Sequence, residues 1–309
     1  MTRPPHIVTV GILIVSLCAP SCSSDPGPVA PPNPSPGSGI RLARGPGSFM
    51  FDGYEPLESK PIRVWYYSPR AVPSGLPIVF VLHGNSRNGD DYRDAWIGAA
   101  EEHLVLVIAP EFDDGFFPGS HGYAQGNVFD ANNNAVSEDL WTFSYIEPLF
   151  DHVKELAASS ADEYAIFGHS AGSQFVHRFL LFKPDARVEK AVAANAGWYT
   201  MPDLSETFPY GLKESGLGEA ALNVFLERPL IVLLGERDTN PNDPSLRQTR
   251  QARAQGRHRL ARGMNFFSKA ESSSAEQGVS LNWQLETVPN VGHSQTRMAG
   301  PAAQLLFGN

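Results

Sequence analysis

The sequence predicts an α/β fold with a mostly parallel central sheet of about eight strands and helices on both faces. Three observations lead to this prediction. From about residue 41 onward, short apolar segments alternate with longer segments whose apolar residues recur at helical spacing. Several short segments are continuously apolar, as strands buried on both faces of a parallel sheet are. No repeat at a fixed period interrupts the alternation, and residues 45–309 are predicted to form one domain.

The predicted strands begin with two segments that read as an antiparallel pair joined by a turn. The next two, with the sequences PIVFVLH and LVLVIA, are fully apolar and are expected at the centre of the sheet. The later ones each follow or precede a helical segment, which favours parallel pairing. In chain order, the predicted strands are residues 49–54, 62–68, 77–83, 104–109, 164–168, 188–194, 230–234 and 281–288.

The predicted helices are amphipathic, with apolar residues three or four positions apart. In chain order they are residues 91–103, 140–158, 171–181, 218–226, 258–272 and 295–307. Residues 111–136 match neither pattern, because they are rich in Gly, Asn, Asp and aromatic side chains. Long ordered loops of this kind are often functional.

Composition and charge exclude several classes of protein. Of the 309 residues, 42% are hydrophobic, which is enough for a substantial core. The formal net charge is −9 and no basic stripe is present, so we expect neither a nucleic-acid partner nor docking on anionic lipid. Both cysteines, Cys18 and Cys22, lie near the N-terminus, which excludes a disulfide framework and a cysteine nucleophile in the rest of the chain.

The N-terminus is predicted to direct export. Residues 1–22 have a basic start at Arg3, an apolar run over residues 7–17 that is too short to span a membrane, and small residues before Cys22. Two outcomes remain open: cleavage that releases a secreted or periplasmic protein, or a lipid on Cys22 that anchors it to a bacterial cell envelope. The region around Cys22 resembles a lipobox, and such a lipid is the one membrane contact we expect. Residues 23–44 are rich in Pro, Gly and Ser and are predicted to be a linker.

The strongest chemical signal is the sequence Gly168-His169-Ser170-Ala171-Gly172, which matches the pattern G-x-S-x-G. It follows a predicted strand and opens a predicted helix, where a sharp turn pushes the serine out of the sheet. The free N–H groups of the helix N-terminus favour developing negative charge there. Ser170 is therefore predicted to be a nucleophile.

Two further segments are predicted to complete the machinery of a serine nucleophile. His83-Gly84-Asn85 follows the strand PIVFVLH, where a loop supplies one oxyanion donor. We assign the donors to the backbone N–H groups of Asn85, with Ser86 as the alternative, and of Ala171.

A serine nucleophile is usually activated by a histidine and an acid, which form a catalytic triad with it. Both are predicted in the loops that follow the last two strands. Asp238 is the chosen acid in Gly235-Glu236-Arg237-Asp238, at the end of the strand PLIVLL, and Glu236 and Asp243 are the alternatives. His293 follows the last strand and is expected to accept the Ser170 proton. The order Ser, Asp, His is that of one large fold family and not that of trypsin-like or subtilisin-like proteases.

Other residues are expected to contribute to the substrate pocket. They flank the nucleophile and the ends of neighbouring strands: His83, Gly84, His169, Trp198 and Tyr199. Trp198 and Tyr199 either stack on an acyl group or pack against neighbouring loops. No spacing typical of metal ligands occurs, so neither a metal nor another cofactor is expected.

These motifs resemble those of the α/β-hydrolase superfamily over roughly residues 45–309. Within it, the chain is similar to secreted esterases related to polyhydroxyalkanoate depolymerases and to feruloyl or acetylxylan esterases, although it lacks the disulfides that these often carry. The resemblance implies an exported serine hydrolase that cleaves small or polymeric carboxylic esters through an acyl-enzyme intermediate. A serine peptidase of the same fold, and a non-catalytic binding protein on this fold, are the alternatives.

Overall fold

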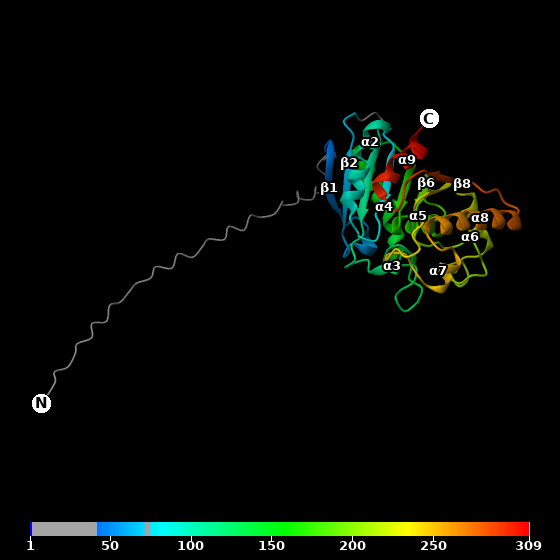
Figure 1. The fold of residues 1–309 in the computed structure, drawn as a ribbon. Helices are drawn as coiled ribbons and strands as arrows, with labels where there is room; N and C mark the ends of the chain where they lie inside the picture. The colour runs from blue at the N-terminus through cyan, green and yellow to red at the C-terminus, as the bar shows by residue number, and fades with distance from the viewer. Residues whose placement is uncertain (2–41, 72–74, 309) are drawn as a thin grey trace. The chain divides into compact units, whose positions relative to one another are not determined.

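The computed structural model describes Met1 and residues 42–71 and 75–308 (Figure 1). Apart from Met1, the predicted signal peptide over residues 1–22 therefore lies outside the described residues, and so does most of the predicted linker over residues 23–44. Within the described part of the chain, no helix has the length and apolar character needed to cross a membrane.

One sheet of eight strands organises the described domain, in the order β1-β2-β4-β3-β5-β6-β7-β8. The strands β1 and β2 pair antiparallel, as predicted, and β2 also runs antiparallel to β4, whereas all later pairings are parallel. The strand bounds are β1 Gly45–Phe51, β2 Ile62–Ser68, β3 Ile78–Leu82, β4 Leu106–Glu111, β5 Tyr164–His169, β6 Val188–Ala194, β7 Leu230–Gly235 and β8 Trp283–Val288. The predicted α/β class is thus confirmed, with eight strands.

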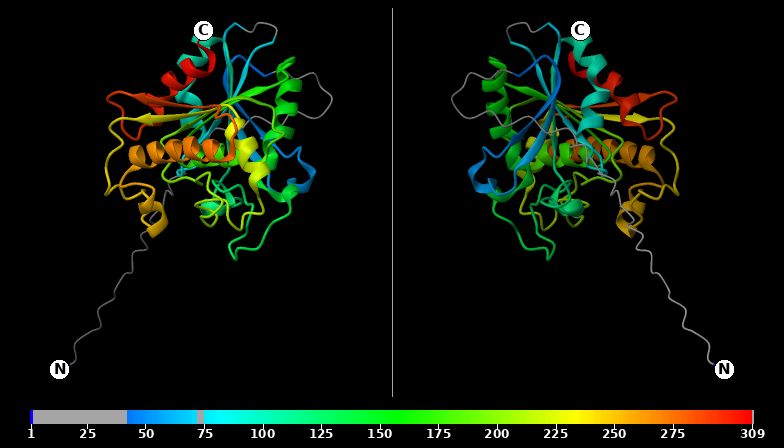
Figure 2. Two further views of the ribbon diagram at one scale, coloured as in Figure 1. Left: turned by 90° about the vertical axis from the view of Figure 1, so that its right-hand side faces the viewer. Right: turned by 90° about the vertical axis from the view of Figure 1, so that its left-hand side faces the viewer.

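Helices cover both faces of the sheet (Figure 2). Alternate residues of the central strands enter different apolar clusters, because side chains in a strand point to opposite faces. In β3, Phe80 belongs to the cluster that includes residues of α4, α5, α6 and α8, whereas Val81 belongs to the cluster that includes residues of α1, α2 and α9. The helix bounds are α1 Gly89–Ala95, α2 Ile97–His103, α3 Gly119–Gly122, α4 Ile146–Ala157, α5 Ala171–Phe182, α6 Glu219–Glu227, α7 Arg250–Ala254, α8 Arg259–Gln277 and α9 Gln295–Phe307.

The structure differs from the predicted elements in several places. The first strand, predicted over residues 49–54, is β1 at Gly45–Phe51. The helix predicted over residues 91–103 is broken at Trp96, which is fully buried between α1 and α2. The first part of the segment predicted as a helix over residues 140–158 forms 3₁₀ turns, and α4 begins only at Ile146. The short helices α3 and α7 were not predicted, because helices of four and five residues are too short to show a helical period.

Candidate active site

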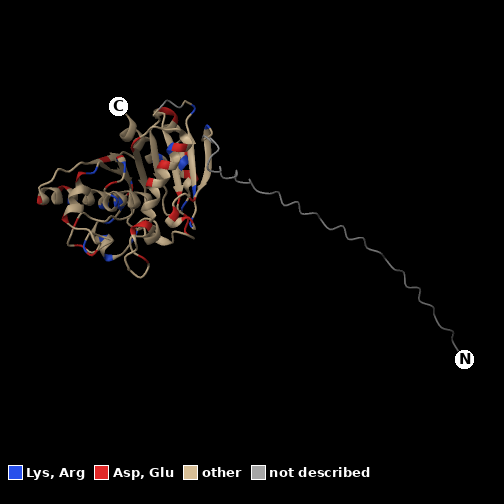
Figure 3. Ribbon diagram, turned by 180° about the vertical axis from the view of Figure 1, so that it is seen from behind, with Lys and Arg blue, Asp and Glu red and all other residues tan. Residues whose placement is uncertain are grey.

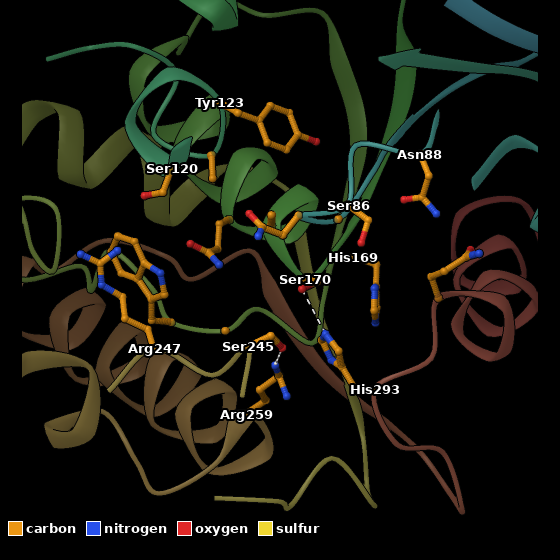
Figure 4. Close-up of a pocket in the computed structure, with 18 of the residues that line it drawn as sticks. Ser86, Asn88, Ser120, Tyr123, His169, Ser170, Ser245, Arg247, Arg259 and His293 are labelled. Carbon is orange, nitrogen blue, oxygen red and sulfur yellow. Dashed lines mark hydrogen bonds between the residues drawn. The ribbon is translucent and has the colours of Figure 1, made fainter. Parts of the chain in front are cut away.

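A pocket of about 470 Å³ lies at the carboxyl ends of the parallel strands (Figure 4). The loops that follow β3, β5, β6, β7 and β8 contribute to it, together with the long loop after β4. This is the edge where ligands bind in open α/β sheets, because the loops that follow parallel strands converge there. The pocket includes Ser170 at its centre.

Ser170 occupies a strained turn between β5 and α5. Its backbone has φ 59° and ψ −113°, a conformation that residues other than glycine rarely adopt. A Cβ atom at Gly168 would lie 2.2 Å from the carbonyl oxygen of Gly172, and one at Gly172 would lie 2.1 Å from the carbonyl oxygen of Leu82. Only glycines at both positions let the turn pack this tightly, which explains the two fixed glycines of the motif.

Three side chains from three different loops form one chain of hydrogen bonds. Nε2 of His293 lies 3.0 Å from Oγ of Ser170, and Nδ1 of the same ring lies 2.7 Å from Oδ2 of Asp238. Since the carboxylate accepts, Nδ1 carries the proton and Nε2 is free to accept the serine proton. Asp238 is only 3% exposed, so little water competes for its carboxylate. The structure thus brings together the three residues that the sequence predicted as a triad.

The two predicted oxyanion donors also line this pocket. Ala171 is the first residue of α5, so its N–H has no acceptor within the helix. The N–H of Asn85 has no hydrogen-bond partner among the described residues. Gly84 leaves room for Tyr92, since a Cβ atom there would lie only 2.7 Å from the hydroxyl of Tyr92.

The structure also separates Asp238 from the two alternative acids. Glu236 is exposed and accepts a hydrogen bond from the hydroxyl of Thr287, at 3.1 Å. Asp243 forms an ion pair with Arg259, at 3.1 Å, and its hydrogen bond with this arginine lowers its pKa. Neither carboxylate forms a hydrogen bond with His293, whereas Asp238 does.

His83 was expected in the pocket, but the structure places its ring beneath the loop. The ring is fully buried, and burial lowers its pKa to about 3. Nε2 accepts the N–H of Phe112 at 3.0 Å, Nδ1 donates to the carbonyl oxygen of Gly84 at 2.9 Å, and the ring stacks on Tyr123. His83 therefore ties the loop after β3 to the loop after β4 and does not line the pocket.

Tyr199 does not line the pocket either, whereas its neighbour Trp198 does. The ring of Tyr199 is fully buried and stacks on Phe266 with a centroid distance of 4.3 Å, so it belongs to the core. Trp198 lines the pocket but is only 3% exposed, because Arg178 and Arg247 lie over its ring. The structure thus places one of the two predicted aromatic side chains at the pocket wall.

His169, also expected in the pocket, does line it. Its ring centroid is 4.5 Å from that of His293, and its Nδ1 is 3.1 Å from the hydroxyl of Tyr92. Burial first, and then the neighbouring His293, hold the pKa of His169 well below its usual value. The ring is therefore neutral at pH 7 and adds no charge beside His293.

Several pocket residues were missed by the sequence analysis. They come from the long loop after β4, from α5, and from the segment that includes the start of α8: Ser120, Tyr123, Gln174, Ser245, Arg247 and Arg259. The aromatic, glycine-rich composition of residues 111–136 was a signal for the first two. Nothing in the local pattern distinguished the arginines from surface residues.

No group of acidic, histidine or cysteine side chains within residues 42–71 and 75–308 is arranged to hold a metal ion. Comparison with family models gives no match. Comparison with curated proteins gives none either.

Solved structures do match the chain. Poly(aspartic acid) hydrolase-1 from Sphingomonas sp. KT-1 is 45% identical, with a TM-score of 0.82, and the match covers 85% of this chain and 99% of that one. LpqC, a poly(3-hydroxybutyrate) depolymerase from Bordetella parapertussis, is 35% identical, with a TM-score of 0.81 and coverage of 86% and 91%.

A more distant match shows the fold alone. The S-formylglutathione hydrolase from Agrobacterium tumefaciens is 18% identical, with a TM-score of 0.53, and the match covers 86% of this chain and 95% of that one. The resemblance that the motifs suggested is therefore confirmed at the level of the family. Given its identity to two hydrolases over nearly their whole length, this chain belongs to the α/β-hydrolases, among their esterase-type enzymes.

Proposed function

We propose that this protein hydrolyses carboxylic esters through an acyl-enzyme intermediate on Ser170. The observation that carries the proposal is a chain of two hydrogen bonds, from Asp238 to His293 and from His293 to Ser170. The serine at its end has a strained backbone and lies inside a pocket. This arrangement activates a hydroxyl that is otherwise a weak nucleophile.

The steps follow from the positions of these groups. His293 takes the hydroxyl proton through Nε2 while Oγ of Ser170 attacks the ester carbonyl. The N–H groups of Asn85 and Ala171 stabilise the oxyanion, each contributing about 3 kcal/mol in comparable sites. His293 then gives the proton to the leaving alcohol. In the second half of the reaction it activates the water that releases the acid and frees Ser170.

The test is hydrolysis of p-nitrophenyl acetate, butyrate and octanoate by the purified protein and by its Ser170→Ala variant. We expect turnover that the variant loses, and a chain-length preference that reports the size of the acyl site. Labelling by a fluorophosphonate, followed by peptide mapping, should identify Ser170. Absence of both turnover and labelling would reject the triad and favour a non-catalytic binding protein.

Hydrolysis of amides is a second candidate, favoured by the 45% identity to an enzyme named for poly(aspartic acid), which is a polyamide. The same serine, histidine and oxyanion donors serve both reactions, but an amide needs its leaving nitrogen protonated. Poly(aspartic acid) and poly(3-hydroxybutyrate) offered separately, with release of soluble products measured, distinguish the two. Cleavage of the polyamide alone would favour amide hydrolysis over ester hydrolysis as the function of this protein.

We also propose that the chain is exported by the signal predicted over residues 1–22. The support is the sequence pattern alone: a basic start, a short apolar run and small residues before Cys22. Mass spectrometry of the mature N-terminus from a bacterial host tests it, and labelled palmitate reveals a lipid on Cys22. An intact N-terminus at Met1 in the fractionated cells would reject export by this route.

A further inference from the structure

Four arginines gather near Trp198, beside the catalytic pocket. The guanidinium carbon of Arg178 lies 4.2 Å from the centroid of the Trp198 ring, and that of Arg247 lies 4.6 Å from it. Arg262 is fully buried and donates to the backbone carbonyl oxygens of the two segments that hold Trp198 and Arg247. Arg259 and Arg247 both line the pocket, and Figure 4 shows Arg247 on the far side of Ser170 from Asn88.

Only one of these four arginines forms an ion pair with a carboxylate of the described residues. Among the ion pairs of the described residues, Arg259 pairs with Asp238 and Asp243, whereas Arg178, Arg247 and Arg262 form none. Burial lowers the pKa of both Arg178 and Arg262, and the next largest cause in each case is a neighbouring arginine. Nη2 of Arg178 is buried without a hydrogen-bond partner. Buried cations without counter-charges are costly, so this cluster has a strong electrostatic preference for an anion.

The pocket itself contains no acidic side chain to balance these charges. None of its lining residues is Asp or Glu, although the whole chain has 33 acidic residues against 24 Lys and Arg. Figure 3 shows acidic residues spread over the rest of the described domain. Of the other titratable groups in the pocket, burial raises the pKa of Tyr92 and Tyr123 and lowers that of His169, so all three are neutral at pH 7. The arginines therefore determine the sign of the potential.

Arg247 has the hydrogen-bonding groups that an anion needs. Its Nε donates to the hydroxyl of Tyr210 at 2.7 Å, which fixes the direction of the guanidinium. Its two terminal nitrogens have no hydrogen-bond partner among the described residues, and the side chain is half-buried at the pocket wall. A planar guanidinium held in this way presents two parallel N–H groups that match the two oxygens of a carboxylate.

We propose that Arg247 binds a carboxylate of the substrate, so that the preferred substrates are acyl compounds with a free acid near the scissile carbonyl. Arg178 and Arg262 supply positive potential behind this contact without touching the ligand. The proposal rests on hydrolysis at Ser170 and specifies the charge of what is hydrolysed. Monoesters of short dicarboxylic acids are the simplest substrates of this class.

The test compares monoethyl succinate with ethyl levulinate, in which a methyl ketone replaces the carboxylate. Initial rates are followed by pH-stat at pH 7.5. We expect kcat/KM for the monoester to be about tenfold higher or more, as one charged hydrogen-bonded contact supplies. The preference should shrink in 0.5 M NaCl because salt screens a partly exposed contact. Equal rates, or a preference for the ketone, would overturn the proposal.

Variants of Arg247 test whether this residue carries the preference. In Arg247→Gln we expect kcat/KM for the monoester to fall about tenfold relative to that for ethyl levulinate, and in Arg247→Lys we expect partial retention, because the charge remains without the fork. Arg250→Gln is the matched control, since Arg250 is exposed on α7 and does not line the pocket, and it should change neither rate. The same preference in wild type and Arg247→Gln would refute the role of Arg247.

A binding measurement separates this proposal from the proposed function. If the wild-type protein cleaves neither ester, the proposed ester hydrolysis is contradicted. The carboxylate site is then tested alone by calorimetry with succinate. Binding to Ser170→Ala that is lost in the Ser170→Ala, Arg247→Gln double variant supports the carboxylate site. Absence of succinate binding to Ser170→Ala refutes it. Thermal unfolding of each variant shows whether it remains folded.

Discussion

Arg259 donates to Oδ1 of Asp238 at 3.3 Å, while His293 contacts the other oxygen of the same carboxylate. The arginine is 1% exposed and also pairs with Asp243, so it joins the start of α8 to two carboxylates of the loop after β7. Both oxygens of Asp238 are thereby fixed. A carboxylate that is fixed at both ends holds the imidazole in one orientation, which a triad requires.

Replacing Arg259 by Gln should therefore lower kcat by about tenfold to a hundredfold. The measurement is kcat for p-nitrophenyl butyrate at pH 7.5.

The conservative variant and a control distinguish positioning from loss of stability. Arg259→Lys keeps the charge beside Asp238 and should retain more of kcat than Arg259→Gln does. Arg253→Gln removes an exposed arginine that bonds only to Gln248, and it should behave as wild type. An unchanged kcat in Arg259→Gln would show that the arginine does not position Asp238.

The glycines of the nucleophile turn allow a second prediction. Gly168→Ala would place a Cβ atom 2.2 Å from a backbone oxygen, and backbone cannot move aside cheaply, so we expect a loss of at least about 2 kcal/mol in the free energy of unfolding. Gly98→Ala in α2 is the matched control, since a Cβ atom there meets nothing within 4 Å. The control should stabilise the protein by about 0.5–1 kcal/mol.

Urea unfolding followed by circular dichroism measures both effects in the free energy of unfolding. Esterase activity adds a second readout, because Gly168→Ala should also displace Ser170 from His293. Two alanine variants of equal stability would contradict the steric argument.

The sequence was enough to predict the fold because its strands and helices have clear periods. Apolar runs such as that of β3 can only be buried on both faces, and Ser170, Asp238 and His293 each follow a strand whose carboxyl end was identifiable. The structure accordingly brings these three side chains together.

Pairwise packing explains what the sequence could not reveal. His83 and Tyr199 stand next to site residues, but whether a ring faces a pocket or the core depends on partners far along the chain, here Phe112 and Phe266. Arg247 has the same limitation, since its position over Trp198 joins residues that no local pattern relates.

A third prediction concerns Arg87, which holds the loop after β4. Its guanidinium donates to the carbonyl oxygens of Phe112 at 2.6 Å and of Phe117 and Gly119 at 2.9 Å, and it lies over the ring of Tyr123. Three carbonyl acceptors need the fan of N–H groups that only an arginine has. Arg87→Ala should free this loop, which contributes to the pocket, and raise KM more than it lowers kcat.

Hydrogen exchange of residues 112–122 measures the loosening directly, and steady-state kinetics separate KM from kcat. Arg87→Lys should behave much like Arg87→Ala, because one ammonium group cannot reach all three carbonyl oxygens. Arg63→Ala serves as the control, since this arginine lies over Trp65 on β2 and does not line the pocket. Protection of residues 112–122 that is equal in wild type and Arg87→Ala would contradict the clamp.

The last prediction follows from the buried, neutral ring of His83. Its folded-state pKa of about 3 lies below the value near 6.5 of an unfolded chain, so the unfolded state binds one more proton between these values. His83 therefore contributes stability that is present above about pH 6.5 and is lost as the pH falls toward 3.

The slope for one proton is about 1.4 kcal/mol per pH unit, so His83 accounts for up to roughly 3 kcal/mol of the loss between pH 6.5 and 4. His83→Gln should start less stable at pH 7.5, because the contact with Phe112 is disturbed, yet lose about 3 kcal/mol less on acidification. Urea midpoints at pH 7.5, 5.5 and 4.5 measure this, with the partly exposed His103→Gln as control. Parallel stability curves for wild type and His83→Gln would mean that His83 is protonated in the folded protein or that its burial is relieved.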